Sequence, residues 1–531
     1  MKRKYVVITG GVLSGLGKGI AIASIGNILS STYKVVPVKC DGYLNVDPGT
    51  MNPFEHGEVF VLDDGGEVDM DFGHYERFLG VNCKSHWNLT MGKVFEEIRK
   101  KERTGDYLGR TVQMIPHVSN FIKNYFKGIG EETNADVVLI EIGGTVGDLE
   151  NELFIEATRG LKQEAGEGNV IFIHLTYVPI PNGVGEQKSK PTQQSISLLR
   201  QRGIEPDIII GRCKEMLSDE VKKKIALSSN INKEDVITGL DVDNVYKIPL
   251  VFEEQGLSQL LARKLNLLIK PNMETWKKLI ENRENAKKEI TIAVAGKYTS
   301  LEDSYASIIE ALHHCEAHFS TKVKIKLVET TNEEIDFQGI SGVIVPGGFG
   351  ARGTEGKIKA IEKCRKEKIP FLGLCYGLQM SVIEFARNVC GQKNANTTEV
   401  EENAENPVID FLDEQKNVKE KGGTMRLGAY PAIIKENTIV NSLYNSKIVS
   451  ERHRHRYEVN PNYHKILEEN GMIFSGMSPD GKLVEFIELK EHPFFVATQA
   501  HPELKSSLTN PAPLFRGFVD AAIKYSEKFV S

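Results

Sequence analysis

The residues with the clearest chemistry are a cysteine held between two glycines and a distant histidine–glutamate pair. Cys375 lies in the sequence Gly-Leu-Cys-Tyr-Gly at 373–377, directly after a short apolar run. Glycines at such a tight turn leave room for a thiol on a strained backbone. A nucleophilic thiolate also needs a base and a carboxylate that orients the base, which His501 and Glu503 can supply. The pattern indicates attack on a carboxamide. The alternative is a buried structural cysteine beside a loop histidine.

A glycine-rich segment near the start of the chain is suited to binding phosphates. A predicted strand at 5–8 runs into five glycines and Lys18, and a predicted helix follows at 21–30. Backbone N–H groups of such a turn and the following helix N-terminus attract phosphate, and a lysine adds positive charge. Two positions depart from the usual phosphate-loop pattern, because Val12 and Gly19 stand where glycine and Ser/Thr are expected. A tight turn without a ligand is the alternative.

Two acidic residues are candidates to hold a metal ion near this segment. Mg²⁺ usually binds one or two carboxylates together with phosphate oxygens and water, and Gly19 has no hydroxyl to offer. Glu141 ends the apolar run 137–140 and precedes two glycines, which is the place for an acidic ligand beside a phosphate loop. Asp71 is the second candidate, with a solvated loop acid as its alternative reading.

Short apolar runs in the sequence predict the strands that position these groups. Short, nearly continuous apolar segments at 5–8, 35–38, 137–142, 170–175 and 207–210 alternate with amphipathic stretches. This alternation predicts a mostly parallel sheet with helices on both faces. A charged, helix-prone stretch at 271–289 interrupts the pattern, and further apolar runs follow at 290–296, 342–345 and 370–374. We therefore predict an N-terminal domain at 1–270, a linker at 271–289 and a second α/β domain at 290–531.

Composition excludes several classes of protein. A chain of 531 residues is too long for one hydrophobic core, which agrees with two or more domains. A net charge of −6 argues against general nucleic-acid binding. Seven cysteines without a Cys-x-x-Cys pair fit a reducing compartment better than a disulfide framework or a zinc site. No segment approaches the about 20 apolar residues that span a bilayer, and the N-terminus does not read as a signal peptide. We expect a cytoplasmic protein that binds neither membranes nor nucleic acids.

Eight segments of the sequence resemble the CTP synthase family in the same order, and the resemblance extends over nearly the whole chain. These segments are residues 9–20, 45–51, 56–61, 141–148, 190–193, 346–350, 422–428 and 451–458. The resemblance implies an α/β protein of two domains. The first is an N-terminal P-loop-like parallel-sheet amidoligase (synthetase) domain, and the second is a C-terminal α/β class I glutamine amidotransferase domain.

The resemblance also implies the reaction. ATP phosphorylates the 4-oxygen of UTP, and ammonia from glutamine hydrolysis passes through an internal channel and displaces the phosphate, giving CTP. The chemistry is reasonable, because a carbonyl oxygen is a poor leaving group until it is phosphorylated. Lys18, Lys39 and a Mg²⁺ cofactor would neutralise charge on the transferring phosphoryl group. The family further implies a homotetramer that can assemble into filaments, inhibition by CTP and activation by GTP.

Site residues follow from the matching motifs. For ATP they are Gly15, Leu16, Gly17, Lys18, Gly19, Ile20, Asp71, Asp241 and Val242. For UTP or CTP they are Ser14, Asp148, Leu149, Glu150, Lys188, Ser189, Lys190, Pro191, Thr192, Gln193 and Lys224. For glutamine they are Gly348, Tyr376, Gly377, Leu378, Gln379, Glu399 and Arg456. The catalytic residues are Cys375, His501 and Glu503, the metal ligands are Asp71 and Glu141, and Arg426 matches a region tied to GTP activation.

The sequence departs from the family pattern at four positions. Gly42 replaces a proline, Gly15 a serine, Leu240 a lysine and Ala500 an aromatic residue. Loss of the proline loosens a loop beside the nucleotide site, and the other changes remove single contacts. None of the four removes a catalytic group.

Two alternatives to CTP synthesis remain open. Another phosphate-loop amidoligase that acts on carboxylates would share the loop and the glutaminase half. It would not need the Lys-Pro-Thr-Gln segment at 190–193. A regulatory paralogue with decayed sites is the non-enzymatic alternative. The presence of Lys18, Glu141 and the Cys375–His501–Glu503 set argues against it.

Overall fold

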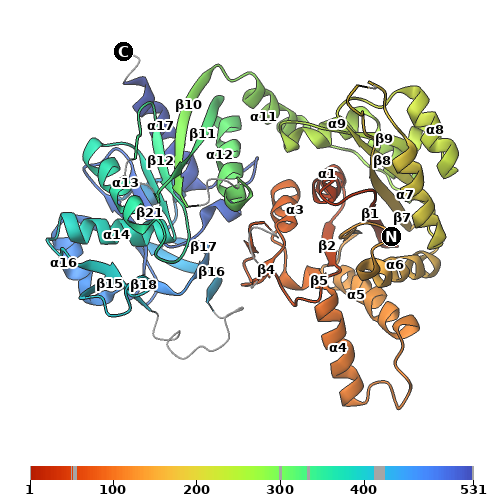
Figure 1. Ribbon diagram of the computed structural model, residues 1–531, viewed down its shortest axis with the longest axis horizontal. Helices are drawn as coiled ribbons and strands as arrows, with labels where there is room; N and C mark the ends of the chain where they lie inside the picture. The colour runs from red at the N-terminus through yellow and green to blue at the C-terminus, as the bar shows by residue number, and fades with distance from the viewer. Residues whose placement is uncertain are drawn as a thin grey trace. The chain divides into compact units, whose positions relative to one another are not determined.

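The computed structural model describes residues 2–49, 51, 57–183, 185–297, 302–331, 335–411 and 425–528. The chain forms two compact units (Figure 1). The first comprises Met1–Pro48 and His74–Lys277, and the second comprises Gly49–Gly73 and Lys278–Ser531. His56 and residues 422–424, which belong to two of the family-like segments, lie outside the described part of the chain. Within that part, no helix has the length and apolar character needed to cross a bilayer.

The first unit is built on a seven-stranded sheet in which every strand pairing is parallel. Its strands, in spatial order, are β5 (Asn88–Thr90), β2 (Val35–Asp41), β6 (Val137–Ile142), β1 (Lys4–Gly10), β7 (Val170–Tyr177), β8 (Ile208–Cys213) and β9 (Val236–Leu240). Strands β1, β2 and β6 are buried along their whole length, as expected when helices cover both faces. The predicted parallel sheet is therefore confirmed.

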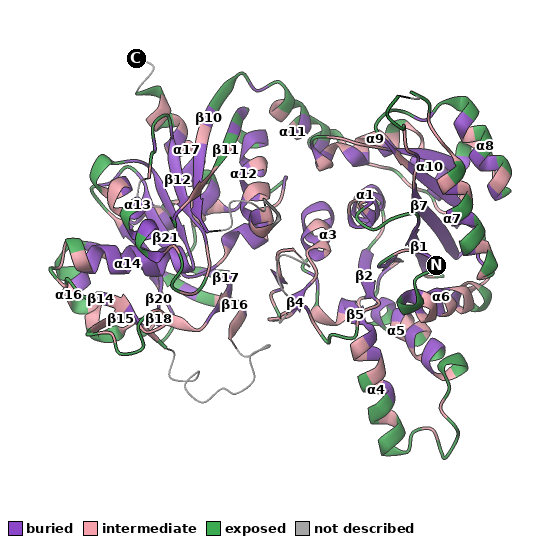
Figure 2. Cartoon of the chain, viewed as in Figure 1, coloured by how far each residue is buried: buried purple, intermediate pink, exposed green. Residues whose placement is uncertain are grey.

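Helices of the first unit pack on this sheet, and Figure 2 shows buried residues on its strands and on the helix faces that cover them. The helices are α1 (Lys18–Ser30), α4 (Met91–Thr104), α5 (Ser119–Glu132), α6 (Glu152–Ala165), α7 (Lys190–Gln201), α8 (Asp219–Ser229), α9 (Ile248–Glu254) and α10 (Leu257–Leu265). Two further helices, α3 (Asp71–Leu79) and α11 (Glu274–Glu284), cross the boundary between the units along the chain. The stretch 271–289, predicted as a linker, thus contains a helix.

The second unit contains a nine-stranded mixed sheet. In spatial order its strands are β11 (Thr321–Glu329), β10 (Lys288–Gly296), β12 (Gly342–Val345), β13 (Phe371–Leu374), β21 (Phe495–Thr498), β20 (Val484–Leu489), β19 (Met472–Met477), β16 (Arg426–Ile434) and β17 (Ile448–His455). The pairings from β11 to β21 are parallel, and those from β21 to β17 are antiparallel. Parallel strands place their carboxyl ends at one edge, where the turns after β12 and β13 meet.

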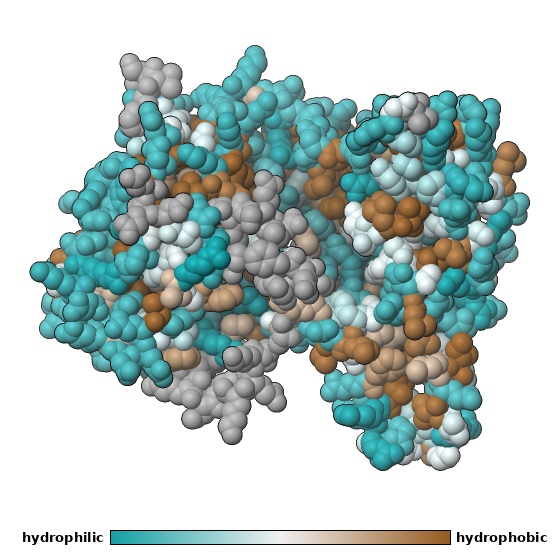
Figure 3. All heavy atoms as spheres, viewed as in Figure 1, coloured by the Kyte–Doolittle hydropathy of each residue, from teal (hydrophilic) through white to brown (hydrophobic). Residues whose placement is uncertain are grey.

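Smaller elements complete the second unit. A three-stranded sheet joins β14 (Ala395–Thr397), β15 (Asn406–Phe411) and β18 (Tyr457–Val459), and β3 (Phe60–Val61) pairs with β4 (Glu67–Val68) as a hairpin. The helices are α12 (Ala306–Phe319), α13 (Thr354–Glu367), α14 (Tyr376–Asn388), α15 (Ile439–Tyr444), α16 (His464–Glu469) and α17 (Pro513–Glu527). Hydrophilic side chains cover most of the face drawn in Figure 3, and the apolar core lies between sheet and helices.

Candidate functional site

Cys375 lies at a sharp turn between β13 and α14. Its backbone has φ 50° and ψ −101°, a strained conformation that costs about 1–3 kcal/mol and must be held by its surroundings. The N–H of Cys375 donates to the carbonyl of Thr498 in β21 at 2.7 Å. A Cβ at Gly377 would lie 2.2 Å from the carbonyl oxygen of Val345, and one at Gly373 would lie 2.8 Å from Ala497 Cβ. Both glycines are therefore required by close packing around the turn.

His501 and Glu503 form the pair expected of a base and its orienting carboxylate. His501 Nδ1 lies 2.7 Å from Glu503 Oε1, and Glu503 is 3% exposed. Burial alone would lower the pKa of His501, but the Glu503 carboxylate and the Cys375 thiolate outweigh burial and raise that pKa well above its usual value. A protonated imidazole next to a thiolate is the arrangement that activates a cysteine nucleophile.

The imidazole of His501 and the side chain of Cys375 both lie close to Gly347. A Cβ at Gly347 would lie 2.9 Å from His501 Cε1 and 3.7 Å from both His501 Nε2 and Cys375 Cβ. Within the described part of the chain, His501 Nε2 is buried and has no hydrogen-bond partner. Catalytic hydrogen bonds are often long without substrate, so this nitrogen is placed to exchange a proton with the thiol or with a leaving group.

The loop after β12 and the start of α14 contain Gly348 and Tyr376, whose N–H groups are predicted to bind an oxyanion. Tyr376 is the first residue of α14, so its N–H has no partner within the helix. Gly348 lies in the loop after β12, and Glu399 Oε1 accepts the N–H of Gly350 in the same loop at 2.7 Å. Burial raises the pKa of Glu399. The loop after β12 is therefore held to Glu399 and, through the Tyr376 hydroxyl and the carbonyl of Gly350, to the start of α14. The roles of Gly348, Tyr376 and Glu399 stay predictions.

Lys357 and Gln499 belong to this site, and sequence reasoning missed both. Lys357 is 1% exposed, and its Nζ lies 4.8 Å from the centre of the Tyr376 ring. The same Nζ is close to Gly348, because a Cβ added to that glycine would lie 3.3 Å from it. Burial lowers the pKa of Lys357 to about 7. The available signal was the helical spacing of Lys357, Ile361 and Cys364 at i, i+4 and i+7, which is the spacing of one face of a helix.

Gln499 contacts the thiol directly. Its Nε2 lies 3.7 Å from Cys375 Sγ, and its Oε1 lies 3.4 Å from Gln379 Nε2. Gln379 Nε2 also donates to the carbonyl of Tyr457 at 3.0 Å, which places Gln379 in this cluster. Arg456 lies between β17 and β18 next to Tyr457, and Leu378 follows Gly377 in the first turn of α14. Gln379 and Gln499 therefore lie beside Cys375. That Gln379, Arg456 and the other predicted residues bind glutamine stays a prediction.

Arg426 is placed in the interior of the second unit. Its guanidinium donates to Glu458 at 3.0 Å and to Glu485 at 2.7 Å, and its side chain is 9% exposed. The ring of Tyr430 lies 4.5 Å from the guanidinium carbon. These contacts show Arg426 as the centre of a buried ion-pair group. A role in GTP activation stays a prediction.

In the first unit, the segment between β1 and α1 has the shape of a phosphate loop. Val12, Gly15 and Gly17 have φ of 78°, 73° and 84°, and α1 begins at Lys18 without a side-chain cap. Lys18 Nζ donates to the carbonyl of Gly144 at 2.7 Å, so it lies beside the turn after β6. The open N–H groups at the start of α1 are suited to an anion.

Glu141 is the second-last residue of β6 and lies opposite Ile8 of β1, shortly before this loop. It is 1% exposed, lies 3.0 Å from Lys39 Nζ and accepts a hydrogen bond from the Tyr75 hydroxyl. No group of three or more His, Cys, Asp or Glu suited to a metal ion occurs among the described residues. A single buried carboxylate completed by phosphate oxygens and water is nevertheless an ordinary Mg²⁺ donor set, so Glu141 fits the ion. Asp71 begins α3, and its contiguous segment belongs to the second unit.

Arg212, which the sequence analysis did not single out, joins the phosphate loop to the predicted adenine side. Its Nε donates to Asp241 Oδ1 at 2.7 Å, and its Nη1 donates to the carbonyl of Gly15 at 3.2 Å. Asp241 follows β9 and precedes Val242, so one arginine connects two segments predicted to bind ATP. An arginine at the end of the apolar run 208–211 was the available signal.

The residues predicted to bind UTP or CTP lie in two groups. Lys188, Ser189 and Lys190 lead into α7, in which Pro191, Thr192 and Gln193 form the first turn. Lys224 lies on α8, where it pairs with Glu220 at 2.6 Å. Lys188, the ion-pair partner of Glu186, lowers the pKa of Glu186, and Lys224 adds a smaller effect in the same direction. In the other group, Asp148 accepts bonds from Thr145, and Leu149 is 83% exposed beside Glu150. Ser14 lies exposed in the phosphate loop.

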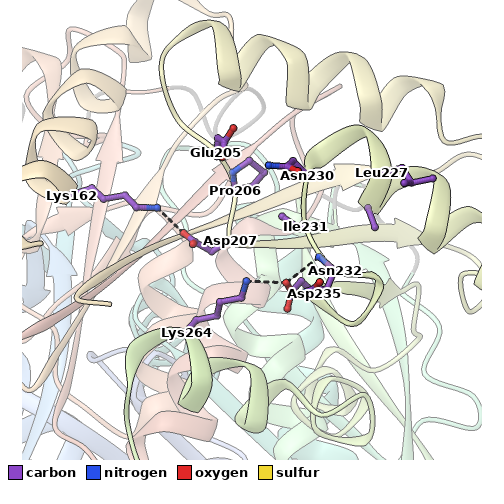
Figure 4. A pocket seen from close by; sticks show the side chains of 11 residues that line it. Lys162, Glu205, Pro206, Asp207, Leu227, Asn230, Ile231, Asn232, Asp235 and Lys264 are labelled. Atoms are coloured by element: carbon purple, nitrogen blue, oxygen red, sulfur yellow. Dashed lines mark hydrogen bonds and ion pairs between the residues drawn. The ribbon is translucent and has the colours of Figure 1, made fainter. Parts of the chain in front are cut away.

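A cavity of about 400 Å³ elsewhere in the first unit contains none of these residues (Figure 4). Four of its charged groups form two ion pairs, Lys162 with Asp207 at 3.1 Å and Lys264 with Asp235 at 2.8 Å. The candidate sites are instead the surroundings of Cys375 and the phosphate loop, where the predicted residues lie.

Comparisons with known proteins match both halves of the chain. The model of the CTP synthase N-terminus matches residues 4–267, and that of class-I glutamine amidotransferases matches residues 300–521. The CTP synthase of Borreliella burgdorferi is 53% identical over 528 residues, covering 98% of this chain and 99% of that protein. The CTP synthase of Methanococcus maripaludis is 51% identical over 534 residues, covering 98% and 100%. The Trypanosoma brucei CTPS glutaminase domain with bound acivicin has a TM-score of 0.42 and 35% identity, covering 44% of this chain and 94% of that structure.

Proposed function

The chain belongs to the CTP synthase family of glutamine-dependent ligases in pyrimidine synthesis, and we propose how its two domains share the reaction. An amidoligase domain at 1–270 phosphorylates the 4-oxygen of UTP with ATP. An amidotransferase domain at 290–531, after the linker 271–289, releases ammonia from glutamine. Ammonia passes through an internal channel and replaces the phosphate to give CTP. The observation that carries the proposal is the Cys375 turn with its His501–Glu503 pair in a chain that also has the Lys18 phosphate loop.

In the amidotransferase domain we assign the chemistry to three side chains. The Cys375 thiolate attacks the carboxamide carbon of glutamine, and the N–H groups of Gly348 and Tyr376 bind the oxyanion. Protonated His501 gives its proton to the departing ammonia, and then takes one from the water that hydrolyses the thioester to glutamate. Glu503 holds the imidazole in this orientation through Nδ1. Gln379, Glu399 and Arg456 hold the amino-acid end of the substrate.

In the amidoligase domain Lys18 and the N–H groups of the loop hold the phosphates of ATP. Glu141 and Asp71 would hold Mg²⁺, which supplies charge neutralisation on the phosphates when bound. Lys39 is kept next to Glu141 by its 3.0 Å ion pair, ready to contact the transferring phosphoryl group. The segment 188–193 and Lys224 hold the triphosphate of UTP or CTP, with Asp148, Leu149 and Glu150 on the pyrimidine side.

Regulation and assembly are part of the same proposal and rest on family membership. GTP activates glutamine hydrolysis through the region of Arg426, and CTP inhibits by occupying the UTP triphosphate segment. The protein works as a cytoplasmic homotetramer that can assemble into filaments.

The proposal is tested by one assay. Incubation with ATP, UTP, glutamine and Mg²⁺ yields CTP, which is followed by absorbance. Replacing glutamine by ammonium chloride also yields CTP, because the amidoligase domain uses ammonia directly. If neither nitrogen source gives CTP while ATP, UTP and Mg²⁺ are saturating, the proposed function is wrong.

A further inference from the structure

The β3–β4 hairpin comes from the N-terminal half of the sequence but packs within the second unit. Residues 49–73 belong to the same compact unit as residues 278–531. The N–H of Ala429 in β16 donates to the carbonyl of Asp63 at 3.0 Å. A Cβ at Gly428 would lie 2.6 Å from the backbone nitrogen of Gly65, so the two backbones are in close contact. The hairpin is thus attached to β16.

Arg452 in β17 is the side chain that the hairpin holds most closely. It is fully buried, its Nε donates to Asp63 Oδ1 at 2.6 Å, and its guanidinium lies 5.4 Å from the ring centre of Phe60. Lys505 Nζ lies 3.4 Å from the same carboxylate oxygen. Burial would raise the pKa of Asp63, but the two cations outweigh it and lower that pKa below its usual value. Asp63 is therefore ionised at neutral pH.

The backbone of the same strand holds the two residues that carry out glutamine hydrolysis. The carbonyl of Arg452 accepts the N–H of His501 at 2.7 Å. The carbonyl of Arg454 lies 3.8 Å from Cys375 Sγ. The side chain of Arg454 in turn donates from Nε to Glu67 Oε1 at 2.8 Å, and Glu67 is buried. Each carbonyl thus belongs to an arginine whose side chain is held by an acidic residue of the hairpin.

We propose that Asp63 and Glu67 are positioning residues for glutamine hydrolysis. By holding Arg452 and Arg454 they fix the two β17 carbonyls that contact His501 and Cys375. The distance between thiol and imidazole then depends on a segment outside the amidotransferase sequence. This inference rests on the proposed roles of Cys375 and His501, and it adds two residues that touch neither glutamine nor the reacting atoms.

The test replaces each acid by its neutral isostere, Asp63→Asn and Glu67→Gln. Matched controls are Asp520→Asn on α17 and Glu362→Gln on α13, which remove exposed pairs with Lys524 and Lys366. Three quantities are measured: kcat and KM for glutamine hydrolysis, the rate of Cys375 alkylation by iodoacetamide against pH, and CTP formation from ammonia.

We expect kcat for glutamine hydrolysis to fall by about 100-fold in Asp63→Asn, because displacing reacting groups by about 1 Å has that effect. KM changes less, since binding groups stay in place. The alkylation profile shifts to higher pH as the imidazole moves away from the thiol. Asp63→Glu restores part of kcat, and CTP formation from ammonia keeps its wild-type rate.

The inference is overturned if both variants match their controls in kcat and in alkylation profile. It is also overturned if glutamine hydrolysis and ammonia-driven synthesis fall together with the melting temperature, since that indicates a merely structural role. Asp63→Asn leaves the buried Arg452 without its partner, which can prevent folding. In that case Glu67→Gln provides the test of the inference, because its partner Arg454 has a side chain that is 30% exposed. Failure of the proposed function looks different, because the unsubstituted protein would then give no CTP from either nitrogen source. Failure of the role given to Cys375 is also distinct, because Cys375→Ala would then still hydrolyse glutamine.

Discussion

Replacing Glu503 by glutamine tests how the imidazole of His501 is used. The substitution keeps the shape of the side chain and removes the carboxylate that lies 2.7 Å from Nδ1. At a separation of about 4 Å between charge centres and an effective dielectric constant of about 20, the lost attraction is about 4 kcal/mol. A hydrogen bond to a charged group contributes about 1.5–3 kcal/mol by mutational measurement. We take about 2–4 kcal/mol as the loss.

The sign of the change follows from the direction of the pKa shift. The Glu503 carboxylate raises the pKa of His501 against the effect of burial, so its removal lowers that pKa. The imidazolium form of His501 becomes less populated at neutral pH, so fewer molecules have the protonated imidazole beside the Cys375 sulfur. A loss of about 2–4 kcal/mol corresponds to an about 30- to 1,000-fold fall in kcat for glutamine hydrolysis, since about 1.36 kcal/mol is tenfold.

Two measurements on Glu503→Gln check this reasoning. Glutamine-driven CTP formation should fall by the stated factor, while ammonia-driven formation should stay unchanged. Alkylation of Cys375 against pH should move to higher pH. A variant that retains wild-type glutamine hydrolysis, or whose alkylation profile moves to lower pH, would refute the role given to Glu503.

Three further predictions concern the turn, the first unit and the phosphate loop. Gly377→Ala places a Cβ 2.2 Å from a backbone oxygen, so glutamine hydrolysis should be lost and stability should fall by about 1–3 kcal/mol, as chemical denaturation would show. Buried His174, whose pKa burial lowers to about 3, stays neutral in the folded state. The free energy of unfolding should therefore decrease as the pH falls below 6.5, by up to about 1.4 kcal/mol per pH unit. The decrease should be less steep in His174→Asn. Equal slopes for the two proteins would contradict this prediction. Lys18→Met should reduce both glutamine- and ammonia-driven synthesis by at least about 100-fold while Cys375 alkylation stays unchanged.

Features set by local sequence were predictable. The nearly continuous apolar run that ends in Glu141 could only be a buried strand of a parallel sheet, and β6 is such a strand. The glycines around Cys375 indicated a tight turn, and the close approach of Val345 and Ala497 shows why larger residues are excluded. In both cases the signal lies within a few residues of the structure that it determines.

Features set by distant partners were not predictable. The resemblance ties Arg426 to GTP activation, but nothing in the local sequence predicts its ion pairs with Glu458 and Glu485, which lie 32 and 59 residues away. The hairpin at 60–68 gave no sign that it packs in the second unit, because Asp63 and Arg452 are 389 residues apart. Ion pairs of this kind leave no periodic pattern in the sequence.

The most direct test of the division of labour is Cys375→Ala, assayed with two nitrogen sources. Only the amidotransferase step uses the thiol, so glutamine-driven CTP formation should be abolished and ammonia-driven formation should remain at the wild-type rate. Loss of both activities in a folded protein, or survival of glutamine-driven synthesis, would contradict the account.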